Sequence, residues 1–179
     1  MKILVRQEEP EDRAAVSAVV ARAFEDMEES DHQEHFLVER LRDSEAFLPA
    51  LSLVAELEDG RIAGYILLTK AKIVSAEKTF PVLALAPLAV LPEFQNQGIG
   101  TALITSAHEI ASRSGFGLSV LLGHKTYYPK FGYRKASDYG ISFPFEAPDD
   151  CALVKALLPG ALQSVSGVVR YPDAFFPEG

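Results

Sequence analysis

The chain has few of the residues that disulfides, metal clusters and membrane spans require. It has 179 residues and a single cysteine, Cys151, which excludes an internal disulfide framework and a cluster of cysteine metal ligands. No apolar run approaches the ~20 residues that cross a bilayer. Residues 1–6 are too short a stretch, and become charged too soon, for a signal peptide. We therefore expect a cytoplasmic protein that does not enter a membrane.

Basic residues are scarce as well. The 17 lysines and arginines face 25 aspartates and glutamates, which gives a formal net charge of −8. Nonspecific binding to nucleic acid or to anionic membranes depends on a basic surface, so we expect neither partner. An anionic cofactor held by a local group of backbone amides remains compatible with this charge. With 48% hydrophobic residues the chain can form one domain with a sizeable core, as a monomer or a homodimer.

The hydrophobic pattern predicts alternating strands and helices without repeats or low-complexity linkers. The expected strands cover residues 3–6, 53–57, 62–68, 82–90 and 118–122, and the second and third are joined by an Asp-Gly turn. One helix opens at Pro10 and buries a valine stripe, a second spans residues 35–41, a third follows residue 98, and a short one lies near 127–131.

The most informative segment joins the strand at 82–90 to the third helix. It consists of Gln95, Asn96, Gln97, Gly98, Ile99 and Gly100. The first amides of a helix have no internal partners, and the helix dipole adds a partial positive charge there. Two glycines let this backbone approach an anion closely, which predicts a phosphate site. The alternative is a glycine-rich turn that only reverses the chain.

Two familiar nucleotide motifs do not fit this segment. Leu103 stands where a dinucleotide-binding fingerprint needs its third glycine, and no lysine separates Gly100 from Thr101 as a P-loop requires. The remaining pattern, Gln-x-x-Gly-x-Gly, resembles the pyrophosphate-binding motif of the GCN5-related N-acetyltransferase (GNAT) superfamily.

A second segment is similar to the same family. Residues 127–133, Tyr-Tyr-Pro-Lys-Phe-Gly-Tyr, resemble its Tyr-x-x-x-Gly-aromatic pattern, in which the tyrosine protonates the departing CoA thiolate. Tyr128 takes that position, and a phenol with a pKa of about 10 is protonated at neutral pH. The alternatives are Tyr127 as the acid or a purely structural aromatic cap. The asparagine that many members carry six residues earlier is Leu122 here.

The resemblance covers about residues 2–145 and implies an α/β GNAT fold. Its mixed central sheet has two splayed parallel strands, here 82–90 and 117–122, with flanking helices. We assign residues 1–146 to the N-acetyltransferase domain. Residues 147–179 form a short C-terminal β extension packed on the same domain, with strands near 152–158 and 168–171, similar to a bacterial branch of predicted N-acetyltransferases.

The resemblance also implies acetyl-CoA as the donor co-substrate and no metal. Main-chain groups of three apolar residues would contact the pantetheine arm, the amides of residues 97–101 would face the pyrophosphate, and two polar side chains would lie at its rim. The implied cofactor-binding residues are Leu88, Ala89, Val90, Gln95, Asn96, Gln97, Gly98, Ile99, Gly100 and Thr101.

The predicted reaction is transfer of an acetyl group to a primary amine, of a small molecule or of a protein or peptide, by direct attack on the thioester. Tyr128 would be the general acid. The alternatives are a non-catalytic acyl-CoA-binding regulatory module and transfer to a hydroxyl. Cys151 is expected in the core instead of serving as a covalent nucleophile.

No general base is assigned from the sequence. Deprotonating a lysine-like amine at pH 7 costs about 4.6 kcal/mol, whereas an α-amine costs only about 1 kcal/mol. Glu56 and Glu93 are candidates without geometric support, and His108 is expected to face solvent. Six acidic residues between the first two helices are expected to be a solvated loop or, as a hypothesis, to attract a cationic amine: Glu25, Asp26, Glu28, Glu29, Asp31 and Glu34.

Overall fold

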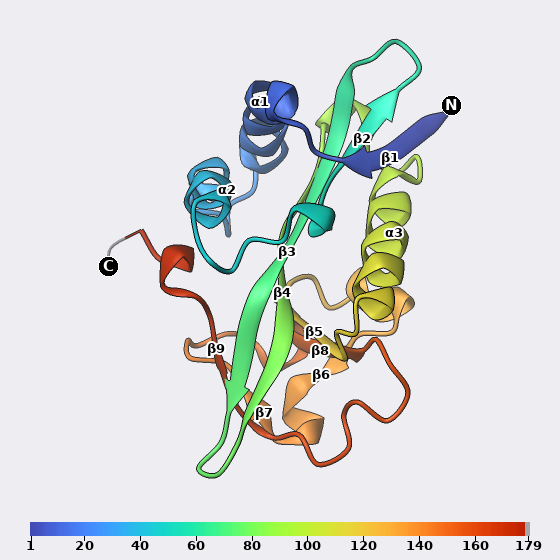
Figure 1. Cartoon of the computed structure of the whole chain (residues 1–179). Helices are drawn as coiled ribbons and strands as arrows, with labels where there is room; N and C mark the ends of the chain where they lie inside the picture. The colour runs from blue at the N-terminus through green and yellow to red at the C-terminus, as the bar shows by residue number, and fades with distance from the viewer. Residues whose placement is uncertain (178–179) are drawn as a thin grey trace. The chain divides into compact units, whose positions relative to one another are not determined.

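The computed structural model describes residues 1–177 and has the mixed α/β architecture that the sequence predicts (Figure 1). Its helices are α1 (Arg13–Phe24), α2 (Glu34–Arg42) and α3 (Ile99–Arg113). Its strands are β1 (Ile3–Gln7), β2 (Ser52–Leu57), β3 (Ile62–Val74), β4 (Thr79–Val90), β5 (Leu118–Leu122), β6 (Arg134–Lys135), β7 (Ile141–Ser142), β8 (Ala152–Ala156) and β9 (Gly167–Arg170). None of the helices within residues 1–177 is both long and apolar enough to cross a bilayer.

The element order agrees with the prediction, and two of the differences concern the shape of single elements. A 3₁₀ helix at Tyr128–Phe131 replaces the predicted short helix. Strand β3 continues to Val74 instead of ending near residue 68. The extra length has a physical reason: Lys72 to Val74 pair with Arg170 to Val168 of β9, a long-range partner that local sequence does not reveal.

The nine strands of the described residues form one mixed sheet. Strand β4 runs parallel to β5, through the pairs Leu83–Ser119 and Ala84–Val120. Only these two pairs are made, although β4 continues to Val90 and β5 to Leu122. This short parallel pairing is what two splayed strands require.

The chain divides into two compact units, and the first contains residues 1–69, residues 86–107 and the segment that begins at Asp173. Successive side chains of a strand point to opposite faces, and β3 uses both faces here. Tyr65 and Leu67 pack into a core with valines and leucines of α1 and α2. Gly64, which directly precedes Tyr65 and so points to the opposite face, faces Ile99 and Leu103 of α3. The two helix layers therefore cover opposite faces of this part of the sheet (Figure 1).

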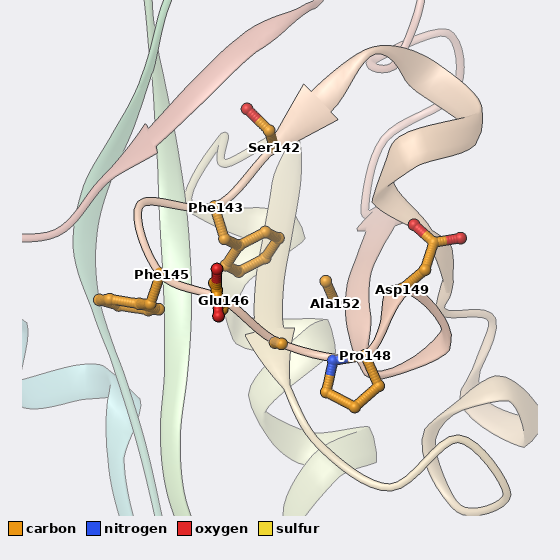
Figure 2. A pocket seen from close by; sticks show the side chains of 8 residues that line it. Ser142, Phe143, Phe145, Glu146, Pro148, Asp149 and Ala152 are labelled. Carbon is orange, nitrogen blue, oxygen red and sulfur yellow. The ribbon is translucent and has the colours of Figure 1, made fainter.

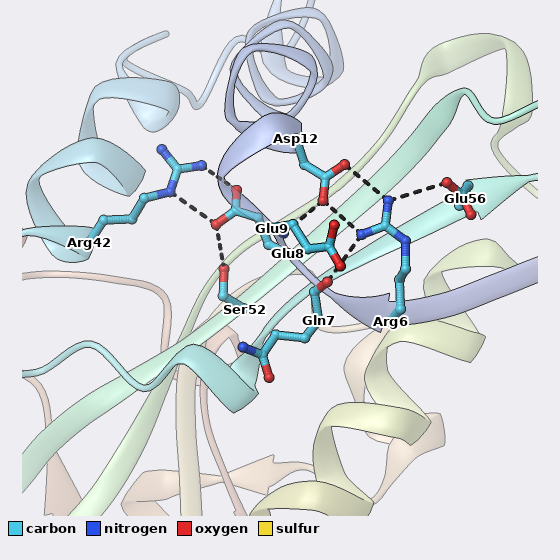
Figure 3. A network of polar contacts seen from close by, with 8 residues as sticks. All are labelled: Arg6, Gln7, Glu8, Glu9, Asp12, Arg42, Ser52 and Glu56. Carbon is cyan, nitrogen blue, oxygen red and sulfur yellow. Dashed lines mark hydrogen bonds and ion pairs between the residues drawn. The ribbon is translucent and has the colours of Figure 1, made fainter.

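A polar network joins the start of this unit to α2 (Figure 3). It pairs Arg42 with Glu8, whose side chains are only 6% and 4% exposed. Ser52 donates to Glu8 at 3.1 Å and lies 2.6 Å from the Tyr65 hydroxyl. An ion pair this deeply buried is tolerated because Arg42 binds Glu8 through two nitrogens and Ser52 donates a further hydrogen bond to the carboxylate.

The second unit contains residues 70–85 and 108–172. Strand β8 pairs antiparallel with β5 on one side and with β6 on the other. Strand β9 pairs with β3 and β7. Both β8 and β9 come from the predicted C-terminal extension, whose residues 178 and 179 lie outside the described part of the chain. The boundary at residue 147 stays a prediction. Cys151, predicted to be in the core, is only partly buried.

Candidate functional site

The motif turn links the end of β4 to the start of α3. Asn96 and Gly98 take left-handed conformations, with φ of 62° and 90°. The amide of Ala102 donates to the Gly98 carbonyl at 3.0 Å, the first bond of the helix. The amides of residues 99–101 therefore precede the helical hydrogen-bond ladder and are available to an anion.

The predicted motif side chains brace this turn. Nε2 of Gln95 donates to the Val90 carbonyl at 3.1 Å, and Nε2 of Gln97 donates to the Glu93 carbonyl at 3.2 Å. Residues 95–98 and Thr101 are exposed, whereas Ile99 is 1% exposed and anchors the helix in the core. A Cβ on Gly98 would meet no atom of the described chain within 4 Å. The outer side of the turn is thus open, as an anion site requires.

The end of β4, from Ala86 to Val90, carries the other predicted cofactor residues and lies in the same unit. Ala89 is buried, whereas Leu88 and Val90 are partly buried. The amide of Leu91 donates to the Ala63 carbonyl at 2.9 Å, so β3 still holds the chain where β4 ends. The role of residues 88–90 toward a pantetheine arm stays a prediction.

Gly64 positions the motif helix, and sequence reasoning missed it. A Cβ on Gly64 would lie 2.9 Å from Cγ2 of Ile99, 3.0 Å from Cδ1 of Leu103 and 3.2 Å from the Ala89 carbonyl oxygen. Only glycine therefore lets the first turn of α3 approach β3 this closely. The available signal was a glycine inside an otherwise apolar strand, where it often marks a close approach.

The second unit holds Tyr128, whose ring lies against the backbone at the end of β5. A Cβ on Gly123 would lie 2.8 Å from Cδ2 of Tyr128 and closer still to Cε2. The Tyr128 ring also makes edge contacts with Tyr127 and Tyr133, at centroid distances of 5.1 and 5.8 Å. Gly123 and Tyr133 thus form a seat that fixes the ring. The Tyr128 hydroxyl donates to no group within residues 1–177.

Burial raises the pKa of Tyr128, and the neighbouring Tyr127 raises it further. Burial also raises the pKa of Tyr127, whose ring is covered by the Lys130 ammonium at 4.2 Å and packs on Phe131 at 5.3 Å. Both phenols are therefore protonated at neutral pH. Their surroundings differ, because Tyr127 packs within its own 3₁₀ segment whereas Tyr128 reaches β5.

His108 is not the solvent-facing residue that the sequence suggested. It is partly buried, and its Nε2 lies 2.8 Å from the Tyr133 hydroxyl, which in turn lies 2.7 Å from Oγ of Ser119. Burial, followed by the charge of Lys155, lowers the pKa of His108 to about 4. The polar positions around His108 misled the prediction, because its partner comes from a distant aromatic residue.

Both carboxylates considered as bases are paired with arginine. Glu56 lies 3.2 Å from Arg6, which also holds Asp12 (Figure 3). Glu93 lies 3.0 Å from the exposed Arg22, whose hydrogen bond lowers the carboxyl pKa. In the acidic connection after α1, Oγ of Ser30 donates to Glu34, while most of the other carboxylates are exposed. Neither candidate is an unpaired base.

A groove of about 660 Å³ opens in the second unit between the end of β7 and the start of β8 (Figure 2). Its lining combines aromatic, small apolar and acidic side chains: Ser142, Phe143, Phe145, Glu146, Ala147, Pro148, Asp149 and Ala152. This volume lies within the range of about 300–1,000 Å³ typical of small-molecule sites. The sequence predicted the start of the C-terminal extension in this loop but no binding site.

Comparison with known proteins places these features in one family. The model of the acetyltransferase (GNAT) domain matches residues 49–135. The uncharacterized N-acetyltransferase YjhQ of Escherichia coli K12 is 35% identical over 167 residues, covering 90% of this chain and 88% of the relative. The uncharacterized N-acetyltransferase YhbS of the same strain is 28% identical over 173 residues, covering 97% of this chain and 98% of the relative.

Solved structures of GNAT acetyltransferases are also similar to this chain. A crystal structure of Escherichia coli YhbS in complex with CoA superimposes with a TM-score of 0.87 at 26% identity, covering 98% of this chain and 92% of that one. A GNAT family acetyltransferase from Brucella melitensis in complex with acetyl-CoA has a TM-score of 0.79 at 32% identity, covering 98% and 99%.

Proposed function

The chain belongs to the GNAT family of acetyltransferases, and we propose that it transfers an acetyl group from acetyl-CoA to a primary amine in a bacterial cytoplasm. The amine nitrogen attacks the thioester carbonyl carbon directly, and the carbon–sulfur bond breaks. Tyr128 gives its proton to the departing thiolate and recovers one from solvent. The amine loses its extra proton to water.

The assignment of acetyl-CoA rests on the motif turn together with the two solved relatives that contain CoA or acetyl-CoA. Amides of residues 97–101 would receive the pyrophosphate, where the helix dipole and open backbone favour negative charge. Main-chain groups of residues 88–90 would pair with the pantetheine amides as an added strand does. Gln95 and Asn96 would border the pyrophosphate.

The seating of Tyr128 carries the mechanistic part of the proposal. A general acid needs a hydroxyl that is protonated, fixed and uncommitted to other partners. Tyr128 meets all three conditions among the described residues: its pKa is raised by burial, its ring lies on Gly123, and its hydroxyl is unpaired. Tyr133 fails the third condition, because His108 and Ser119 already engage its hydroxyl.

Thermal unfolding with and without acetyl-CoA tests the donor, with CoA and ATP as controls. Saturation at 100 times Kd should add about 2.7 kcal/mol of stability, a shift of several degrees for this size. A shift with acetyl-CoA and CoA but not with ATP supports the donor assignment. Amine-dependent release of CoA, with acetylated product found by mass spectrometry, then tests the transfer. Donor binding without turnover over a broad amine panel would reject it.

A further inference from the structure

We propose that the groove between β7 and β8 binds the acceptor, and that this acceptor carries a second positive charge separated from the reacting amine by an apolar segment. The inference rests on the proposed function, since it names the class of amine that the enzyme would acetylate. The residues that would bind the acceptor are Phe143, Phe145 and Glu146, which all come from the loop that follows β7 (Figure 2).

The apolar part of the groove suits a hydrocarbon segment. Phe143 and Phe145 line it together with Pro148 and Ala152. Tyr171 supports both aromatic rings, at centroid distances of 6.4 Å from Phe143 and 5.4 Å from Phe145. Rings fixed in this way offer a rigid apolar wall, and their faces also attract cations.

The charges of the groove leave one carboxylate for the ligand. Asp149 lies 3.7 Å from Lys135, and its neighbour Asp150 lies 3.4 Å from Lys125. Within residues 1–177, by contrast, Glu146 makes no ion pair. A groove with aromatic walls and a carboxylate that lacks a cationic partner is complementary to an organic cation.

Backbone pairing connects the groove to the Tyr128 seat. Ala152, which lines the groove, is the register partner of Leu122 at the end of β5. The next amide, that of Gly123, donates to the Cys151 carbonyl at 2.9 Å. Gly123 is also the residue on which the Tyr128 ring lies. Ala152 of the groove and Gly123 of the Tyr128 seat therefore lie at the same ends of β8 and β5.

The chemistry of nucleophilic attack explains why Glu146 would bind a cation other than the reacting amine. The reacting nitrogen must be neutral, and a carboxylate beside an ammonium stabilises its charged form and raises its pKa. Glu146 would therefore slow the reaction if it held the attacking amine. By holding a distant cation instead, it anchors the acceptor while the reacting amine remains free to lose its proton.

Two amines with the same number of carbons test whether Glu146 binds a second cation of the acceptor. Cadaverine carries two amines on a five-carbon chain, and pentylamine carries one. We expect Glu146→Gln to lower kcat/KM for cadaverine about tenfold, as loss of one charge-assisted contact would, and to change kcat/KM for pentylamine less than twofold. Phe143→Ala should lower kcat/KM for both amines. Glu77→Gln, on the exposed turn between β3 and β4, is the matched control for charge.

Calorimetry of cadaverine binding in the presence of CoA keeps this test independent of turnover. Weaker binding to Glu146→Gln than to the wild type and to Glu77→Gln supports the groove. Equal binding to all three proteins, or no binding to the wild type, overturns it. An enzyme that acetylates other amines without any response to Glu146→Gln also overturns the groove while leaving the proposed function intact. Absence of transfer to every amine instead rejects the proposed function.

Discussion

The motif turn and the Tyr128 seat solve the same steric problem with different parts of the protein. Each depends on a glycine that lets another element approach the backbone of a strand: Gly64 under α3, and Gly123 under the Tyr128 ring. At the turn the proposed functional groups are main-chain amides, so the fold would need only to place a helix end. At the seat the proposed functional group is one hydroxyl, whose position depends on the packing of several rings. Substitutions at the seat should therefore affect the chemical step, and those at the turn should affect binding.

The largest effect should come from Tyr128→Phe, which removes the proposed acid and keeps the ring. We expect kcat to fall about 100-fold or more, as for loss of a general acid. The thermal shift with acetyl-CoA should stay unchanged, because the donor would be held by the turn. Steady-state kinetics checks the first statement, and thermal unfolding with and without acetyl-CoA checks the second. Tyr127→Phe is the matched control, and a larger loss in that variant would transfer the acid role to Tyr127.

Gly123→Ala should act through Tyr128, because the new methyl group would occupy the space of its ring. We expect kcat to fall about 10- to 100-fold, the cost of a displacement near 1 Å, with KM for acetyl-CoA nearly unchanged. A double-mutant cycle sharpens the prediction. If Gly123 only positions Tyr128, adding Gly123→Ala to Tyr128→Phe should cause little further loss. Fully multiplicative losses would contradict the seat.

Gly98→Ala probes the turn, and Gly60→Ala is its control because the two glycines have nearly the same φ. Gly98 and Gly60 have φ of 90° and 89°, and a Cβ at either would meet no atom of the described chain within 4 Å. Alanine should cost each site about 1–2 kcal/mol of stability. Only Gly98→Ala should also weaken acetyl-CoA binding, by about tenfold, since hydrogen bonds to a charged ligand would be disturbed. Equal acetyl-CoA affinity in the two variants, measured by calorimetry, would remove the turn from the donor site.

The last prediction concerns the support behind the seat, and near neutral pH its effect should be the smallest. The pKa of His108 is about 4 in the folded chain, below its ordinary value of 6.5. Between these values the unfolded chain binds more protons, so stability is complete above about pH 6.5 and decreases as the pH falls toward 4. The decrease is at most about 3 kcal/mol. His108→Gln should abolish this part of the pH dependence, as urea unfolding at several pH values would show. An unchanged acid dependence would exclude His108 as its source.

Local patterns carried much of this information. The spacing of apolar residues predicted α1, α2, α3 and most strands, because each periodicity reflects a buried face. The motif turn was predictable for the same reason, since glycines between a strand and a helix act through the backbone of neighbouring residues. The extension of β3 to Val74 was missed because β9, its partner there, lies almost a hundred residues away in the sequence.

The sequence by itself determined the family and the order of elements and predicted the segments that would hold a donor, since these depend on contiguous residues. Only the tertiary structure decided that His108 lies behind Tyr133, that Glu56 and Glu93 are paired with arginines, and that a groove opens beside β8. It also decided that Tyr128, and not Tyr133, has an uncommitted hydroxyl among the described residues. These features depend on which distant side chains meet, and that is settled by packing.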